Sequence, residues 1–325
     1  MTREPPAGQP FDVVTAGETM AVIAPDPPGR LAPGAVHLDV GGAESNVATW
    51  LAQAGRRVAW VSRLGDDPPG RIVRERVAAG GVDVSLTGTD RQAPTGLYVR
   101  ERGAVVYYRK GSAASRMTAA IWDLPALRGA RVVHLSGITP ALSPSCHDLV
   151  RHALELRPVP GAVYTFDVNH RPALWRPGEA AGTLAALARR ADVVFTGRDE
   201  AETLWGTPDP DSIRALLPEP PVLVVKDAHV GATAFSPAGR VHVHTPPVQV
   251  VDPVGAGDAF AAGYLLGLLD DADEAERLKR GHALAARAMS TVGDIAAALA
   301  SSGLQAGPGI SAAPDTDRVP AEGIT

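Results

Sequence analysis

Short apolar runs typical of β-strands alternate with helix-like segments over most of this chain, and this order constrains the fold more than any single motif. The strand-like runs occupy residues 11–15, 58–62, 131–135, 163–168, 192–195 and 222–226. Consecutive strands separated by helices pair in parallel, and right-handed connections place helices on both faces of the sheet. The pattern therefore predicts an α/β fold with a doubly wound, mostly parallel sheet sandwiched by helices.

Two adjacent strand-like runs, 96–100 and 104–109, interrupt this alternation. No helix separates them, so they predict a β-hairpin inserted into the fold as a lid. Tyr107 and Arg109 share one face of the second strand because side chains alternate with a period of two. An aromatic ring beside a guanidinium can flank a sugar and clamp a carboxylate. Alternatively, an exposed hairpin carries such residues for solubility alone.

Composition excludes several classes of protein. The 325 residues are 45% hydrophobic with a net charge of −5, which disfavours a nucleic-acid or anionic-membrane partner. No apolar run approaches membrane-spanning length, and the polar, proline-rich start does not resemble a signal peptide. Cys146 is the only cysteine, which indicates an inert thiol in a reducing compartment, the cytoplasm. Residues 301–325 have few large apolar side chains, and we expect them to be disordered.

The segment VDPVGAGDAF, residues 251–260, is the strongest functional signal. We expect a strand at 248–251, a turn, and a helix through 259–269. Such a joint presents unpaired N–H groups at a helix amino terminus, where an anion binds well, and Gly255 and Gly257 allow close approach. Asp258 is placed to act as a base in phosphoryl transfer to an alcohol. The helix dipole should lower its pKa. On these residues alone, a tight turn with an aspartate cap is the simpler interpretation.

Other polar residues stand at predicted strand ends or helix starts. Gly41 and Gly42 precede a helix that begins near Glu44 and Asn46, which fits either a ligand site or a plain turn. Glu18 follows the first strand, where it either touches a substrate or lies in a solvated turn. Glu200 is either a helix-dipole partner or holds Mg²⁺ through water. Turn or cap roles are expected for Asp66 and Asp67, and surface roles for His242 and His244.

The sequence resembles the ribokinase-like (PfkB) carbohydrate kinase family from about residue 11 to residue 294. Within that family it is most similar to members that act on 2-keto-3-deoxygluconate. The resemblance rests on GGAESNVA from Gly41, TGLYVRE from Thr95, YYRKGSA from Tyr107, HLSGITPALSP from His134, DVNHRPALW from Asp167 and DPVGAGDAFAAGYL from Asp252. The sequence has neither a P-loop nor a strand-linked G-x-G-x-x-G motif.

The resemblance implies one sugar kinase domain over 11–300, with the strands of a small β-sheet lid inserted at about 31–41 and 95–111. It implies ATP as donor, Mg²⁺, a monovalent cation as a further candidate, a sugar acid as acceptor, and a homo-oligomer formed through the lid. Asp258 would be the base, with Gly255, Ala256 and Gly257 as the anion hole. Substrate-binding residues would be Gly42, Ala43, Glu44, Asn46, Tyr98, Tyr107, Arg109, Arg171, Asp252 and Asp294. Nucleotide-binding residues would be Asn169, Arg171, Gly197, Lys226, Gly231, Gly255 and Gly257, and Glu200 would serve Mg²⁺.

Two positions depart from the family pattern. Gly197 stands where an Asn or Ser is usual, and Ala228 replaces the first glycine of K-x-G-x-x-G, with the extra carboxylate Asp227 beside it. These changes bear on nucleotide binding more than on acceptor chemistry. Besides phosphorylation of 2-keto-3-deoxygluconate to its 6-phosphate, two alternatives remain. One is a fructokinase or other neutral-sugar kinase, and the other, motivated by Gly197 and Ala228, is a sugar-binding or regulatory protein that has lost catalysis.

Overall fold

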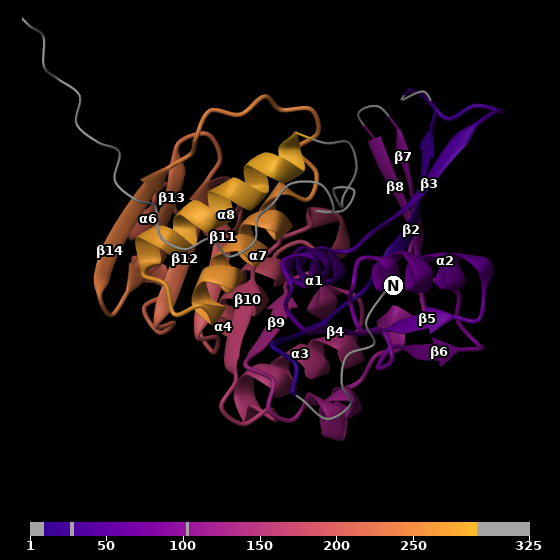
Figure 1. Cartoon of the computed structure of the whole chain (residues 1–325), viewed down its shortest axis with the longest axis horizontal. Coiled ribbons are helices and arrows are strands. Elements are labelled where there is room, and N and C mark those ends of the chain that lie inside the picture. The colour runs from indigo at the N-terminus through magenta and orange to yellow at the C-terminus, as the bar shows by residue number, and fades with distance from the viewer. Residues whose placement is uncertain (1–9, 27–28, 102–103, 291–325) are drawn as a thin grey trace, which may run out of the picture.

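A large sheet forms the centre of the molecule in a computed structural model, which describes residues 10–26, 29–101 and 104–290 (Figure 1). Its strand order is β14-β13-β12-β11-β10-β9-β1-β4. The strands are β1 Val13–Ala16, β4 Val58–Val61, β9 Val132–Ser136, β10 Val163–Asp167, β11 Val193–Gly197, β12 Val222–Asp227, β13 Gly231–Ser236 and β14 Gly239–His244. All pairs from β4 to β12 are parallel, and β13 and β14 add antiparallel strands at one edge. The predicted mostly parallel sheet is confirmed.

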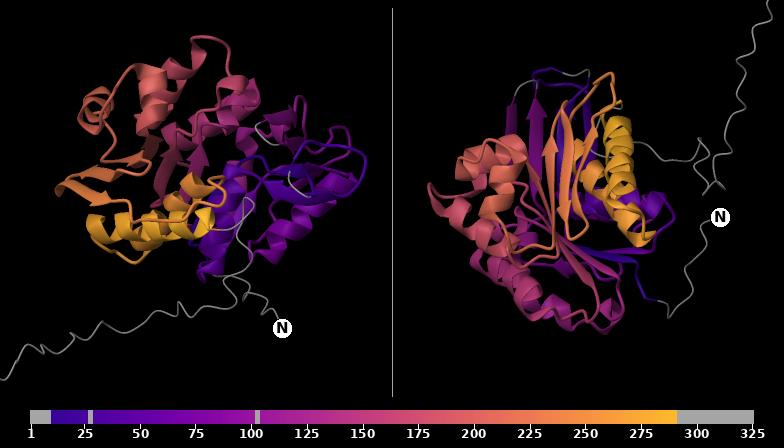
Figure 2. Two further views of the ribbon diagram at one scale, coloured as in Figure 1. Left: turned by 90° about the horizontal axis from the view of Figure 1, so that it is seen from above. Right: turned by 90° about the vertical axis from the view of Figure 1, so that its left-hand side faces the viewer.

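Helices cover both faces of this sheet (Figure 2). Neighbouring residues of one strand enter different cores, as Val132 and Val133 do, which explains why the strands read as continuous apolar runs. One core includes side chains of α1 Ala43–Gln53, α2 Pro68–Ala79, α7 Ala256–Leu269 and α8 Glu274–Met289. The other includes side chains of α3 Pro144–Leu156, α4 Glu179–Ala188, α5 Arg198–Trp205 and α6 Pro210–Leu216.

Short elements complete the described residues. A two-stranded parallel sheet joins β5 Arg63–Gly65 and β6 Gly88–Asp90. Short 3₁₀ helices occupy Ala114–Arg116, Ala119–Asp123, Pro125–Leu127, Thr139–Ala141 and Pro172–Leu174. No helix in the described ranges is long and apolar enough to cross a membrane.

A second, four-stranded sheet stands apart from the large one, at the upper right of Figure 1. Its order is β3-β2-β7-β8, with β2 Met20–Pro25, β3 Val36–Gly41, β7 Leu97–Glu101 and β8 Ala104–Tyr108. The hairpin expected from the sequence is the β7–β8 pair. Strand β2, which pairs with both β3 and β7, was not predicted. We call these four strands the small sheet.

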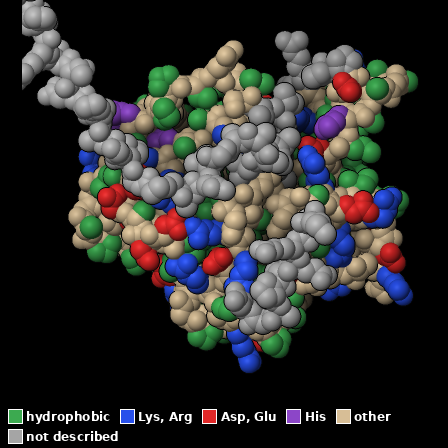
Figure 3. All heavy atoms as spheres, in the orientation of Figure 1, with side chains coloured by type: hydrophobic (Ala, Val, Ile, Leu, Met, Phe, Trp, Pro, Cys, Tyr) green, Lys and Arg blue, Asp and Glu red, His purple; other side chains and the backbone are tan. Residues whose placement is uncertain are grey.

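The small sheet exposes large apolar side chains. Leu38 on β3 and Val106 and Tyr108 on β8 are 53%, 50% and 61% exposed. Hydrophobic side chains are visible over this part of the molecule in Figure 3. Exposed apolar side chains gathered on one sheet mark a surface suited to association.

One expected strand is absent. Residues 248–251 form no strand, and Val250 and Val251 are 54% and 55% exposed. Their segment runs beside the end of α8, where the Val251 and Asp252 N–H groups donate to the Met289 carbonyl. An apolar run becomes a strand only if another strand's backbone pairs with it, and none does here.

Predictions about several individual residues outside the cavity were confirmed. Asp67 is the N-cap of α2, where its carboxylate accepts from the Gly70 N–H at 2.8 Å, as expected for a cap. Cys146 is a free, buried thiol whose pKa is raised by burial to about 11, so it is inert as expected. His242 and His244 are exposed on β14, which confirms the surface positions expected for them.

Candidate active site

A cavity of about 730 Å³ lies between the small sheet and the carboxyl ends of the large sheet's central strands. Strands β10, β11 and β12 end at its wall, which is where parallel sheets bind ligands. The predicted residues that line it are Gly42, Ala43, Asn46, Tyr98, Tyr107, Arg109, Asn169, Arg171, Gly197, Glu200, Lys226, Gly255, Gly257 and Asp258. Five others do not line it or are not described: Glu44, Gly231, Asp252 and Ala256 lie outside the lining, and Asp294 lies outside the described residues.

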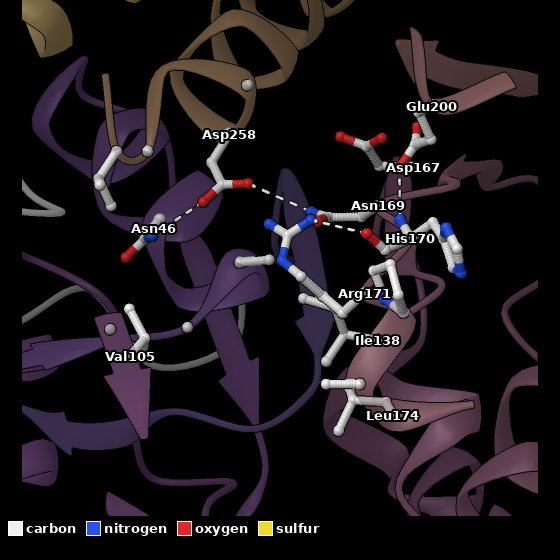
Figure 4. A pocket seen from close by; sticks show the side chains of 18 of the residues that line it. Asn46, Val105, Ile138, Asp167, Asn169, His170, Arg171, Leu174, Glu200 and Asp258 are labelled. Carbon is white, nitrogen blue, oxygen red and sulfur yellow. Dashed lines mark hydrogen bonds between the residues drawn. The ribbon is translucent and has the colours of Figure 1, made fainter. Parts of the chain in front are cut away.

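Asp258 is in the first turn of α7 with its carboxylate held between two amides (Figure 4). Asn46 on α1 donates to Oδ2 at 2.8 Å, and Asn169, just after β10, donates to Oδ1 at 3.4 Å. Asn169 takes a left-handed backbone conformation, with φ of 39°, which asparagine tolerates better than most residues. The carboxylate is thus oriented by three separate segments that meet in the cavity.

The pKa expected for Asp258 was wrong in direction. Burial is the main cause that raises this pKa to about 7. The nearby charge of Asp167 contributes to the rise, and the hydrogen bond from Asn46 opposes it. The helix amino terminus was expected to lower it. Desolvation outweighs the dipole because the side chain is removed from water while the dipole charge is only partial. With this pKa, Asp258 is well matched to proton transfer near neutral pH.

The start of α7 presents backbone donors. Gly255 is its N-cap and has φ of 75°, a left-handed conformation that favours glycine. The N–H groups of Gly255, Gly257 and Asp258 have no acceptor among the described residues, whereas Ala256 donates to the Pro253 carbonyl at 3.3 Å. The Ala256 N–H is therefore not one of the free donors, although Ala256 was expected to be part of the anion hole. The remaining N–H groups are suited to bind an anion.

An ion pair lies beside these donors. Lys226, at the end of β12, contacts both carboxylate oxygens of Asp167, at the end of β10, at 2.9 and 3.2 Å. Burial opposes the lysine's charge, but Asp167 and Glu200 outweigh burial and raise the pKa of Lys226. Its Nζ lies 3.6 Å from where a Cβ at Gly257 would be, an ordinary contact distance, so the lysine lies directly beside the start of α7. Asp167 was not among the predicted site residues, although its place at the end of a buried strand marks the ligand side of the sheet.

Glu200 joins two loops at the wall of the cavity. Its Oε2 accepts from the Gly197 N–H at 3.0 Å and from the Thr196 hydroxyl at 3.1 Å, and Oε1 accepts from the His170 N–H (Figure 4). Burial, and then the charge of Asp167, raise the pKa of Glu200. Both oxygens are already occupied, so this carboxylate serves the local structure whatever else it does.

Arg109 follows β8 and is held by Glu18 rather than left free. Nε donates to Glu18 Oε2 at 2.7 Å, and Nη2 lies 2.5 Å from the same oxygen. Glu18 is almost fully buried, so the solvated-turn alternative for it is wrong. Tyr107 stacks against the guanidinium, as the shared face predicted, and its ring centroid lies 5.5 Å from that of Tyr98.

Glu44 is buried behind the cavity, which corrects its predicted contact with a ligand. Oε1 accepts from the hydroxyls of Ser136 and Thr139 at 2.8 and 2.7 Å, and burial raises its pKa despite these bonds. A Cβ at Gly17 would lie 2.1 Å from the Glu44 carboxyl carbon, so glycine is required there. Glu44 therefore joins α1 to the end of β9.

The turn after β12 also differs from expectation. Gly231 lies in the β13 ladder and does not line the cavity. Asp227 accepts from Arg198 Nε at 3.0 Å, so its extra negative charge is compensated. Ala228 has φ of 36°, a conformation that favours glycine, which accounts for a glycine at this place in the family pattern. Asp252 pairs with Arg100 of β7 at 3.2 Å and thus connects the small sheet to the start of α7.

Comparison with known protein families identifies the kind of reaction that this cavity serves. The profile described as "pfkB family carbohydrate kinase" matches residues 11–300. The chain belongs to the pfkB family of carbohydrate kinases. The arrangement of this kinase's cavity suits that class, because phosphoryl transfer depends mainly on positioning and on stabilising charge, and the donors of α7, Lys226 and Asp258 line the same cavity.

Several relatives align with nearly the whole length of this carbohydrate kinase. The 2-dehydro-3-deoxygluconokinase of Bacillus subtilis (strain 168) is 35% identical over 297 residues, which cover 88% of this chain and 91% of the relative. The 2-dehydro-3-deoxygluconokinase of Thermoproteus tenax is 36% identical over 301 residues, which cover 89% and 91%. The crystal structure of a PfkB protein from Polaromonas sp. JS666 matches with a TM-score of 0.80 at 37% identity and covers 86% of this chain and 95% of that one.

Proposed function

We propose that this kinase transfers the γ-phosphoryl group of ATP to the 6-hydroxyl of 2-dehydro-3-deoxygluconate, the sugar acid also called 2-keto-3-deoxygluconate. The observation that carries the proposal is a buried carboxylate, Asp258, whose pKa is raised to about 7 beside free N–H donors at a helix amino terminus. The names of the relatives that are 35% and 36% identical support the choice of acceptor.

In this proposal the substrate hydroxyl lies against Asp258. The hydroxyl oxygen attacks the γ-phosphorus as the bond from that phosphorus to the β-phosphate oxygen breaks, and the hydroxyl proton passes to Asp258. The N–H groups of Gly255 and Gly257 bind the oxygens of the transferred group. Lys226, which lies beside Gly257, supplies positive charge to the same oxygens. Gly197 and Asn169 lie on the nucleotide side of the cavity, and Arg171 lies between nucleotide and acceptor.

The residues present fit a hydrated Mg²⁺. Mg²⁺ keeps several waters and binds through one or two carboxylates together with substrate phosphates. Glu200 accepts two hydrogen bonds on Oε2 and one on Oε1, so the remaining lone pair of Oε1 can accept from a Mg²⁺-bound water, whereas direct ligation would compete with the bonds already made. Bound there with the nucleotide, Mg²⁺ would neutralise charge on the phosphates.

The acceptor end of the cavity suits an acid sugar. Tyr98 and Tyr107 provide aromatic surface, and Arg109 can bind a carboxylate. Gly42, Ala43 and Asn46 line the same end and can contact the sugar backbone and hydroxyls. A carboxylate that enters this cavity loses water, and a charge-assisted hydrogen bond from Arg109 would offset that loss.

The test is an ATP-consumption assay over a panel of acceptors: 2-dehydro-3-deoxygluconate, 2-dehydro-3-deoxygalactonate, 5-dehydro-2-deoxygluconate and fructose. We expect the highest kcat/KM on the first, complete dependence on Mg²⁺, and an NMR spectrum of the product with the phosphate on C6. A higher kcat/KM on fructose would instead assign a neutral-sugar kinase. If none of the four acceptors leads to ADP formation, the protein acts on another acceptor. If the protein also fails to bind nucleotide, it has lost catalysis.

We also propose that two copies associate through the small sheet and that the protein works in the cytoplasm. The exposed side chains of Leu38, Val106 and Tyr108 support the association, and the lone buried thiol of Cys146 supports a reducing compartment. Light scattering should report a dimer or larger oligomer, and Val106→Glu should shift it toward the monomer. A monomeric parent protein at micromolar concentration would contradict the association.

A further inference from the structure

The contact between Glu18 and Arg109 is the most enclosed ion pair at the acceptor end of the cavity. The Glu18 side chain is 0% exposed and that of Arg109 is 9% exposed. The remaining oxygen of Glu18, Oε1, accepts from the Ser112 hydroxyl at 2.5 Å, so both oxygens are engaged. Burying a carboxylate is costly unless it is paired and hydrogen-bonded, and this one is both.

The pair uses one edge of the guanidinium. Nε and Nη2 both approach Glu18 Oε2, which occupies the side-on edge. The ring of Tyr107 covers one face, with its centroid 5.7 Å from the guanidinium carbon. Nη1 has no acceptor among the described residues, and Arg109 lines the cavity. The end-on edge, formed by Nη1 and Nη2, is the part left for a ligand, and it is the edge that matches a carboxylate with two hydrogen bonds.

Neighbouring residues leave room for this pair. A Cβ at Gly96 would lie 2.7 Å from Glu18 Oε1 and 3.4 Å from Arg109 Cβ, so a side chain at position 96 would displace the carboxylate. Another carboxyl group, Glu44, lies near enough for the charge of Arg109 to lower its pKa. Without Glu18, the guanidinium would have that second carboxyl as an alternative partner away from the cavity.

We propose that Glu18 is a positioning residue that fixes the Arg109 guanidinium with its end-on edge toward the cavity, where it binds the carboxylate of an acid sugar. This inference rests on the proposed function, which supplies the acid. Glu18 need not touch the substrate. It acts through Arg109, and the like-charge repulsion between Glu18 and the substrate carboxylate is offset by the guanidinium that lies between them.

A double-mutant cycle tests the inference, with kcat and KM for 2-dehydro-3-deoxygluconate measured in the parent, Glu18→Gln, Arg109→Ala and the double variant. Glutamine keeps the size and one acceptor oxygen but not the charge, so the fold is retained. We expect Arg109→Ala to raise KM by about 10- to 100-fold and Glu18→Gln by about 3- to 10-fold, with kcat nearly unchanged. The double variant should be no worse than Arg109→Ala, because Glu18 acts only through that arginine.

Glu155→Gln is the matched control, since Glu155 forms an exposed ion pair with Arg151 at 2.7 Å, far from the cavity, and should leave KM unchanged. Losses that multiply in the double variant, or a lower KM in Glu18→Gln, would overturn the inference while leaving the proposed function intact. If the parent phosphorylates another sugar acid, the proposed acceptor fails and the same cycle is run on that acid. A parent that accepts no sugar acid overturns both.

Discussion

Asp258 and Glu200 are both carboxylates in the first turn of a helix at the wall of one cavity, yet their surroundings differ. Burial raises the pKa of both. The oxygens of Glu200 accept from two backbone N–H groups and a hydroxyl. Those of Asp258 accept, among the described residues, from the side-chain amides of Asn46 and Asn169, the second at 3.4 Å. Position at a helix start is therefore common to both carboxylates, and we propose that the remaining capacity of the Asp258 oxygens to accept a hydrogen bond fits it for the role of base.

The difference has a physical reason. A proton acceptor must have a lone pair directed at the substrate, and backbone N–H donors that fill the lone pairs remove this capacity. The two asparagine side-chain amides hold Asp258 in place and leave lone pairs of its carboxylate free to accept. Glu200, in contrast, stabilises the turn between β11 and α5 and the loop after β10. The following experiments should separate the two roles.

The largest effect is expected from Asp258→Asn. Asparagine keeps the size and the fold but cannot take the hydroxyl proton, so kcat should fall by about 10²- to 10⁴-fold while acceptor binding persists. Steady-state kinetics and calorimetric binding of the acceptor measure the two quantities. Turnover within about threefold of the parent would remove Asp258 from the role of base.

The pH dependence should follow Asp258 and not Glu200. Since the pKa of Asp258 in the folded protein is about 7, log(kcat/KM) should rise with a slope near one below that pH and level off above it. Each unit below pH 7 then costs about tenfold. A flat profile between pH 5.5 and 8 in the parent would contradict the assignment. In Asp258→Asn the residual activity should lose this limb.

Asp258→Asn should also change stability in a pH-dependent way. The folded-state pKa of about 7 lies above the ordinary value of 3.8, so the unfolded chain releases this proton first and the parent loses stability as pH rises toward 7. Asparagine does not titrate. Between pH 5.5 and 8 the variant should therefore gain about 2 kcal/mol relative to the parent. Urea unfolding at both pH values measures this, and an equal difference at both would contradict burial as the cause.

Glu200→Gln should have a smaller effect on turnover. An amide oxygen still accepts hydrogen bonds, but the charge that favours a hydrated Mg²⁺ is lost, so the Mg²⁺ concentration for half-maximal rate should rise by about three- to tenfold. Saturating Mg²⁺ should restore most of kcat. An unchanged Mg²⁺ titration would leave Glu200 a purely structural carboxylate, and a loss of kcat as large as in Asp258→Asn would remove the distinction between them.

Features that depend on neighbouring residues were predictable from the sequence, as was the mostly parallel sheet, whereas the acidity of a buried group and the pairing of individual strands were not. Asp67 caps its helix through Gly70, three positions away. The acidity of Asp258 is set by burial among residues that include Asn46 and Asn169, which are 212 and 89 positions away. Likewise residues 248–251 pair with no strand among the described residues, whereas Met20–Pro25 pairs with two strands, β3 and β7. Pattern shows that a segment can form a strand, and only the tertiary fold supplies its partners.

Thr196→Val offers the smallest and most selective effect. The Thr196 hydroxyl donates to Glu200 Oε2 at 3.1 Å, and the residue is fully buried but does not line the cavity. Valine is close in shape, so the change removes one donor from Glu200 and leaves its two N–H donors. We expect a loss of about 1 kcal/mol in the free energy of unfolding, or about 2–4 °C in Tm, with turnover and the pH profile unchanged. Thermal unfolding and kcat across pH measure both. The same hydroxyl also lies 3.3 Å from the Gly197 carbonyl, so a fall of tenfold or more in kcat with the fold intact would mean that the placement of Glu200 and the adjoining Gly197 matters to the chemistry as well as to stability.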